Sequence, residues 1–141
     1  MLSVLNKAIV FCSLMTAISC AAGCRPQLIA DKYRVASIGD PGKCLYFVAE
    51  NGEGGHGRVD PHVVSVGWDN AHIIVKQKPQ RSHYDGRGEK QTYMYFIIEH
   101  TKDNLLLNAE EIVVGPLSHS EFESKCRQMR VSSNLNFSVN Y

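Results

Sequence analysis

Between residues 33 and 115 the chain consists of short runs of β-branched and aromatic residues separated by turn-forming residues. Such runs are typical of β-strands, whose successive side chains point to opposite faces of a sheet. The expected strands are residues 33–38, 44–50, 62–68, 72–78 and 92–100, with residues 105–115 as one strand or two short ones. The sequence therefore predicts an α+β fold, namely a mostly antiparallel β-meander of five to seven strands with one C-terminal helix packed on the sheet.

One helix is expected near the C-terminus, where the period of the apolar residues changes. Ser118 and Glu121 have the spacing of a capping box, in which each side chain bonds the backbone N–H of the other residue. Apolar residues then recur at helical spacing, which predicts one buried stripe formed by Phe122, Cys126 and Met129. The helix is predicted over residues 118–130, and the alternating residues 134–141 are a tail or a final edge strand.

Three glycines, Gly52, Gly54 and Gly57, have the spacing of a dinucleotide-binding fingerprint. That motif works only where a helix begins at its end, so that the helix N-terminus can meet the pyrophosphate. Here Pro61 and the β-branched residues within 62–68 predict a strand instead. We therefore expect the glycines to form a hairpin loop, and we expect no bound nucleotide.

Residues 1–23 have the layout of a secretory signal peptide. Lys7 lies in a short N-terminal region, a mostly apolar run extends from Ala8 to Ile18, and small residues follow it. The run is short for a membrane-spanning helix, which needs about 20 apolar residues. The sequence therefore predicts that this segment directs export and is removed.

The four residues "AAGC" at positions 21–24 resemble the lipobox of bacterial lipoproteins. The resemblance implies that Cys24 is acylated and becomes the first residue of the mature protein, with Cys20 as a competing position. Residues 24–32 would then be the lipidated N-terminus and tether of a single β-rich domain over residues 33–133. Several acyl chains would hold the protein firmly on the membrane.

The resemblance also implies a location in the cell envelope. In the sorting rule of lipoproteins from two-membrane bacteria, an aspartate after the acylated cysteine keeps the protein at the inner membrane. Arg25 occupies that position here. The expected location is therefore the periplasmic face of the outer membrane, in a cell that has one.

Two cysteines, Cys44 and Cys126, remain after Cys12 and Cys20 leave with the signal and Cys24 is acylated. Two thiols in an exported protein favour one disulfide bond. The alternative is a pair of free cysteines that behave as small hydrophobic residues. We expect no metal site, because the two cysteines are isolated and no histidine lies at ligand spacing.

The charges and motifs exclude several classes of function. Lysine and arginine number 15 against 14 aspartates and glutamates, and Lys7 lies in the segment expected to be removed. Without a basic excess, a nucleic-acid partner is not expected. The sequence has no nucleophile elbow and no phosphate-binding loop, so we expect neither a catalytic site nor a cofactor. An enzyme whose triad assembles across the fold remains a less favoured hypothesis.

Three segments follow one another in an order that resembles a family of small bacterial lipoproteins known only as a domain of unknown function. They are "VVSVGWDNAHIIVKQ", "YFIIEH" and "VVGPLSHSEFESKC". The resemblance covers roughly residues 24–130, and the "NLNFSVNY" tail departs from it. It implies the location and the fold, and it implies no activity.

Two functions therefore fit the sequence best. The first is a lipid-anchored envelope protein of unknown biochemical activity that binds a partner or supports the cell surface without catalysis. The alternative is an envelope inhibitor or immunity protein that blocks a lytic enzyme with residues 56–62 or 82–90 as the plug. The candidate residues for binding an envelope partner are His56, Asp60, His62, Arg81, Tyr84 and Arg87.

Overall fold

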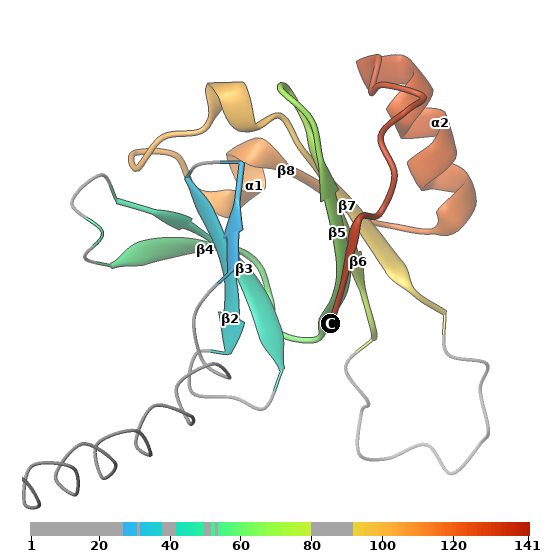
Figure 1. Cartoon of the computed structure of the whole chain (residues 1–141). Coiled ribbons are helices and arrows are strands. Elements are labelled where there is room, and N and C mark those ends of the chain that lie inside the picture. Colours follow the sequence, from blue (N-terminus) through green and yellow to red (C-terminus); the bar gives the residue numbers. More distant parts are fainter. Residues whose placement is uncertain (1–26, 31, 38–41, 50–51, 53, 80–91) are drawn as a thin grey trace, which may run out of the picture.

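The computed structural model describes residues 27–30, 32–37, 42–49, 52, 54–79 and 92–141. These residues form a four-stranded and a five-stranded antiparallel sheet, with one main helix outside the second sheet (Figure 1). The first sheet has the order β1 (Gln27–Ile29), β2 (Tyr33–Ser37), β3 (Lys43–Val48) and β4 (Gly55–Val59). The expected α+β class is confirmed, and the strands are divided between two sheets, which the sequence pattern did not indicate.

The second sheet places its strands in an order close to that of the sequence. Its members are β8 (Val113–Leu117), β7 (Met94–Ile98), β6 (Ile73–Gln77), β5 (Val63–Trp68) and β9 (Val139–Asn140). The runs that predicted strands correspond to β2, β3, β5, β6 and β7. β6 and β7 bury consecutive side chains, because the second sheet is covered on one face by the first sheet and on the other by the helix.

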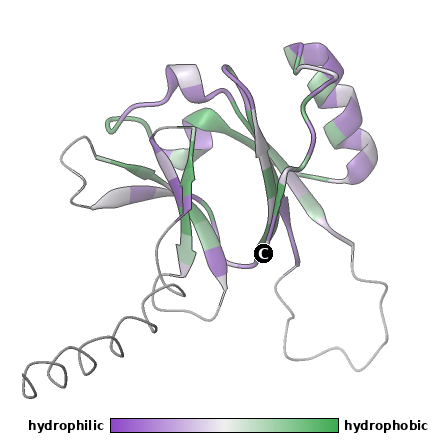
Figure 2. Cartoon of the chain, viewed as in Figure 1, coloured by the Kyte–Doolittle hydropathy of each residue, from purple (hydrophilic) through white to green (hydrophobic). Residues whose placement is uncertain are grey.

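The main core lies between the two sheets, and the hydrophobic colours in Figure 2 concentrate in the strands on either side of it. Its fully buried members include Ile29, Tyr33, Val35, Leu45, Val66, Ile73, Val75 and Ile98. A second cluster lies on the other face of the five-stranded sheet, under the helix, and consists of Ile74, Tyr95, Ile97 and Phe122. The molecule therefore has three layers, which are two sheets and a helix.

The predicted C-terminal helix is α2 (His119–Met129). The backbone N–H of Ser118 donates to Oε2 of Glu121 at 2.8 Å, which confirms the capping box. Phe122 is buried, and its ring stacks on that of Tyr95 at 5.0 Å between centroids. The tail after the helix ends in β9, which pairs with β5, so residues 139–140 form an edge strand.

Gly67 explains how this tail can cross the second sheet so closely. A Cβ added at Gly67 would collide with the backbone carbonyl oxygen of Asn136. A residue without a side chain is therefore required where the tail passes over β5.

The structure corrects the prediction for residues 105–115. Instead of one or two strands, this segment contains the short helix α1 (Ala109–Ile112), and only its last part belongs to β8. The backbone N–H of Asn108 donates to Oε2 of Glu111 at 2.7 Å, the same capping arrangement as in α2. Helix capping therefore overrides the apolar character of this segment.

Two further segments differ from their predictions. Residues 27–29, expected in the tether, form β1, and Ile29 is fully buried against the main core. The glycine-rich hairpin loop is confirmed at Gly52 and Gly54, which have φ values of 74° and 81°. Gly57, however, lies within β4, so the spacing of the three glycines reflects a hairpin and its second strand.

The expected disulfide between Cys44 and Cys126 is not formed, and both residues are free thiols. Cys44 lies in β3 of the first sheet, where its sulfur donates to the carbonyl oxygen of Ala36 at 3.3 Å. Cys126 lies in α2, outside the second sheet, and packs on the cluster beneath that helix. The two residues therefore belong to different layers, and each fills space as a small hydrophobic residue.

Candidate functional site

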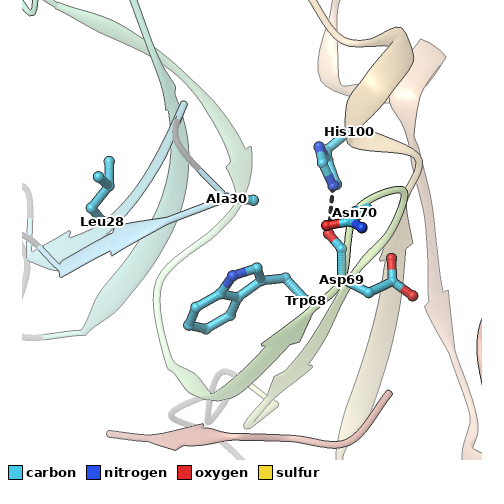
Figure 3. Close-up of a pocket in the computed structure, with 6 residues that line it drawn as sticks. All are labelled: Leu28, Ala30, Trp68, Asp69, Asn70 and His100. Atoms are coloured by element: carbon cyan, nitrogen blue, oxygen red, sulfur yellow. Dashed lines mark hydrogen bonds between the residues drawn. The ribbon is translucent and has the colours of Figure 1, made fainter. Parts of the chain in front are cut away.

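A cavity of about 520 Å³ lies between β1 and the turn that joins β5 to β6 (Figure 3). We call it the Trp68 pocket. It is lined by Leu28, Ala30, Trp68, Asp69, Asn70 and His100. One wall thus comes from the first sheet, and the opposite wall comes from the hairpin turn and the 3-10 helix η1 (His100–Lys102).

The apolar side of the pocket is made by β1 and by the end of β5. Leu28 and Ala30 are two positions apart, and Leu28 is 50% exposed although it is a large hydrophobic residue. Trp68 is half-buried, since part of its side chain packs on the main core. Figure 3 shows the indole projecting into the space between β1 and the hairpin turn.

The hairpin turn is built by the side chain of Asp69. Its Oδ1 accepts hydrogen bonds from the backbone N–H groups of Ala71 at 2.8 Å and His72 at 2.7 Å. Partial burial alone would raise the pKa of this carboxyl group. The two backbone hydrogen bonds, with the nearby His72 and His100, outweigh that effect and hold the pKa of Asp69 below its usual value. The predicted tight turn is confirmed, and it is stabilised by an ionised side chain.

His100 ties η1 to this turn. Its Nε2 lies 2.9 Å from the backbone carbonyl oxygen of Asp69, and its backbone N–H donates to the carbonyl oxygen of Ala71 at 3.1 Å. A carbonyl oxygen can only accept a hydrogen bond, so Nε2 carries a proton and is the donor. The polar wall is therefore rigid, because two elements far apart in sequence hold each other in place.

A buried ion pair lies at the end of η1, where Asp103 is the C-cap residue. Arg58 donates from Nε to Oδ2 of Asp103 and from Nη2 to Oδ1, both at 2.7 Å, and the two side chains are 1% and 0% exposed. The hydroxyl of Tyr33 donates to the same carboxylate at 2.5 Å. Burial, reinforced by this carboxylate, raises the pKa of Tyr33 well above its usual value. The Tyr33 ring also meets the ring of His100 edge-on, at 6.3 Å, and so connects the ion pair to the pocket wall.

The structure does not gather the predicted partner-binding residues around this pocket. His56 and Asp60 are exposed, and His62 is half-buried with a φ of 78°. Among the residues that the structure describes, no three His, Cys, Asp or Glu side chains form a group that could hold a metal ion. The remaining predicted positions lie outside the described residues: Cys24, Arg81, Tyr84 and Arg87.

Sequence reasoning missed the pocket, although it used some of its residues. Trp68, Asp69 and Asn70 were interpreted as a strand end and a turn, and His100 as the end of another strand. A tryptophan directly before an Asp-Asn turn was the available signal, because a turn holds the large ring at the rim of a sheet. Leu28 gave no such signal, since it lies in the segment interpreted as a tether.

Comparison with protein families gives a match to most of the chain. A family model described as "Protein of unknown function (DUF3997)" matches residues 32–140. No curated protein and no solved structure matches the chain. Within the part of the chain that the structure describes, no helix is both long enough and apolar enough to cross a membrane.

Proposed function

We propose a function from the site itself, because the chain belongs to the DUF3997 family, which is described only as a protein of unknown function. The protein is a lipid-anchored module of the bacterial envelope that binds a partner molecule in the Trp68 pocket without catalysis. Binding rests on one observation, a cavity of about 520 Å³ with one apolar and one polar wall. Sites for small ligands are typically hollows of about 300–1,000 Å³ with such a mixed lining.

The pre-formed walls support a binding role. The polar wall is fixed by the hydrogen bonds of Asp69 and His100 to the backbone, so it needs no rearrangement to receive a ligand. A rigid site loses less conformational entropy on binding than a flexible one. Trp68 supplies a large apolar surface, and aromatic rings of this kind often dominate binding energies.

The hydrogen bonds of the titratable groups favour binding over catalysis. In a nucleophile–base pair, the imidazole faces a hydroxyl or thiol and is oriented by a third group. Here Nε2 of His100 is held by a backbone carbonyl oxygen, and Oδ1 of Asp69 is held by two backbone N–H groups. Both side chains are therefore engaged in building the turn.

The proposed anchor rests on the resemblance of "AAGC" to a lipobox. The position of β1 determines how far from that anchor the pocket would lie. Leu28 is four residues after Cys24, and four extended residues span at most about 14 Å. If Cys24 is acylated, the pocket lies next to the lipid surface rather than at the end of a long tether.

Metabolic labelling of the full chain with palmitate tests the anchor. The native chain should incorporate label, and the Cys24→Ser variant should not. An unlabelled native protein, or a mature N-terminus at another residue, would overturn the anchor.

Crosslinking in intact cells tests the binding role. Mass spectrometry should find specific partners of the native protein that are reduced in Asn70→Ala, since Asn70 is exposed and lines the pocket. Ser120→Ala is the matched control, because Ser120 is exposed on α2, away from the pocket. Equal recovery with both variants would count against binding at this site.

The alternative is an inhibitor or immunity protein with residues 56–62 or 82–90 as its plug. Residues 82–90 lie outside the described residues, and residues 56–62 give it less support. Arg58 lies in the middle of that segment, and its side chain is 1% exposed within an ion pair. Val59 is buried in the main core. A segment with its central residues buried offers only its ends to a lytic enzyme.

A further inference from the structure

We propose that the Trp68 pocket binds a sugar ring, so that its ligand is a glycan of the envelope. This inference rests on the proposed function and assigns the chemical class of its ligand. A pyranose ring has a face of C–H groups and a rim of hydroxyl groups that both donate and accept hydrogen bonds. A matching site needs a flat apolar surface beside several polar groups.

The apolar wall provides that surface. The indole of Trp68 projects between β1 and the hairpin turn, and Ala30 lies across from it (Figure 3). Tryptophan suits an amphipathic ligand, because its large ring covers apolar area while polar neighbours remain hydrated. Ala30 has only a methyl side chain, so it occupies little of the cavity of about 520 Å³.

The polar wall matches the rim of hydroxyl groups. The amide of Asn70 carries donors and an acceptor, and Nδ1 of His100 is the ring nitrogen that the bond to Asp69 leaves available for a ligand. Both side chains lie on the turn side of the pocket (Figure 3). The hydroxyl groups of a sugar can form hydrogen bonds with the amide of Asn70 and with Nδ1 of His100, whereas an acyl chain can form none.

The charges of the lining residues argue against a phosphate or carboxylate as the main recognised group. None of the six lining residues is a lysine or arginine, and the pKa of Asp69 is held low, so its carboxylate is negative at neutral pH. Phosphates and carboxylates are usually bound by arginine or lysine. An uncharged polar ligand is therefore favoured over a nucleotide or a lipid phosphate.

The position of the pocket leaves two sources for the sugar. The first is the glycan of the cell wall, and the second is the headgroup of a glycolipid in the membrane that holds the anchor. Both present the same ring chemistry, so the experiment must separate them.

Trp68 is the only tryptophan in the chain, so its fluorescence reports directly on this pocket. The mature full-length protein in detergent micelles is titrated with a soluble oligosaccharide of N-acetylglucosamine. In parallel, the protein in phospholipid vesicles is compared with the protein in vesicles that also contain a glycosylated lipid. A saturable change in Trp68 fluorescence is expected in at least one arm, and the responding arm identifies the source.

Variants and other probes make the test specific. Loss of one hydrogen bond should weaken the binding of the responding sugar by about 2- to 12-fold in Asn70→Ala. Ser120→Ala, which is exposed on α2, should bind as the native protein does. No response to either sugar, an unchanged affinity in Asn70→Ala, or a stronger response to an N-acetyl amino-acid amide or to adenosine would overturn the proposal.

These outcomes differ from those that test the proposed function. If palmitate labelling fails but the oligosaccharide binds, the anchor is wrong and the sugar site stands. If Asn70→Ala loses its crosslinked partners while no sugar binds, the binding module stands and its ligand belongs to another class.

Discussion

Replacing Arg58 by methionine is expected to destabilise the protein by about 3–5 kcal/mol, because it leaves the buried carboxylate of Asp103 without its counter-ion. The structure shows why the loss should be large. The two side chains are 1% and 0% exposed, and Arg58 makes both of its bonds to the carboxylate at 2.7 Å. After the substitution, the hydroxyl of Tyr33 would be the only donor left to the Asp103 carboxylate among the residues that the structure describes. Domains of this size are stable by about 5–15 kcal/mol in total, so the variant should be severely weakened.

Urea unfolding followed by the fluorescence of Trp68 measures this loss. The matched control is Lys102→Met, which removes an ion pair of similar length from the surface. Nζ of Lys102 lies 2.8 Å from Oε2 of Glu99, but the side chains are 68% and 34% exposed. Exposed pairs contribute at most about 1 kcal/mol. Equal losses in the two variants would refute the reasoning, because it makes burial the source of the difference.

We call the bonded side chains of Arg58, Asp103 and Tyr33 the network. A triple variant separates two effects on the free energy of unfolding: the loss caused by leaving Asp103 unpaired, and the net contribution of the whole network. Arg58→Met, Asp103→Leu and Tyr33→Phe together remove both charges and the tyrosine hydroxyl, and only the backbone carbonyl oxygen of Asn104 loses its bond from Nη2 of Arg58. Replacing a buried ion pair by apolar residues is often neutral or stabilising. The triple variant should therefore recover most of the stability lost in Arg58→Met, and a further loss would show that the network itself stabilises the fold.

Three further perturbations have defined outcomes. Gly67→Ala should displace the tail from β5, because the new Cβ collides with the carbonyl oxygen of Asn136, and hydrogen exchange at β9 should become faster. Ser118→Ala should cost about 1 kcal/mol in a urea titration, since it removes the N-cap of α2. Burial raises the pKa of Tyr141 from 10.0 to about 12, so the folded state keeps a proton that the unfolded state releases. Stability should thus be intact below pH 10 and fall as the pH rises towards about 12, and Tyr141→Phe should reduce that fall in an alkaline titration.

Local patterns predicted the elements that local interactions stabilise. β5 and β6 are runs of β-branched residues on either side of an Asp-Asn turn, and α2 has both a capping box and an apolar stripe, so each was expected within a few residues. β1 contains three residues, which is too few for any periodicity to appear. Its pairing is stabilised by the tertiary burial of Ile29, a contact that the sequence does not display.

The error at residues 105–115 has a different cause. Asn108 and Glu111 have the spacing of a capping box, but the leucines before them and the valines after them favoured a strand. Leu106 is 92% exposed, so its apolar side chain carries no information about burial. A capping signal can therefore decide the structure where hydrophobic residues are exposed.

The turn in the pocket wall could be predicted from the sequence. The positions of His100 and Asp103 could not, because they depend on tertiary structure. The turn at Asp69 follows from its sequence, because aspartate readily bonds to backbone N–H groups that follow it. The position of His100 depends on more distant partners, since its imidazole lies between the Asp69 carbonyl and the ring of Tyr33. Asp103 follows closely after His100 and is held by Arg58, which lies 45 residues earlier in the chain. The short helix η1 is therefore fixed by the hairpin turn on one side and by the buried ion pair on the other, so the polar wall exists only once both sheets have assembled.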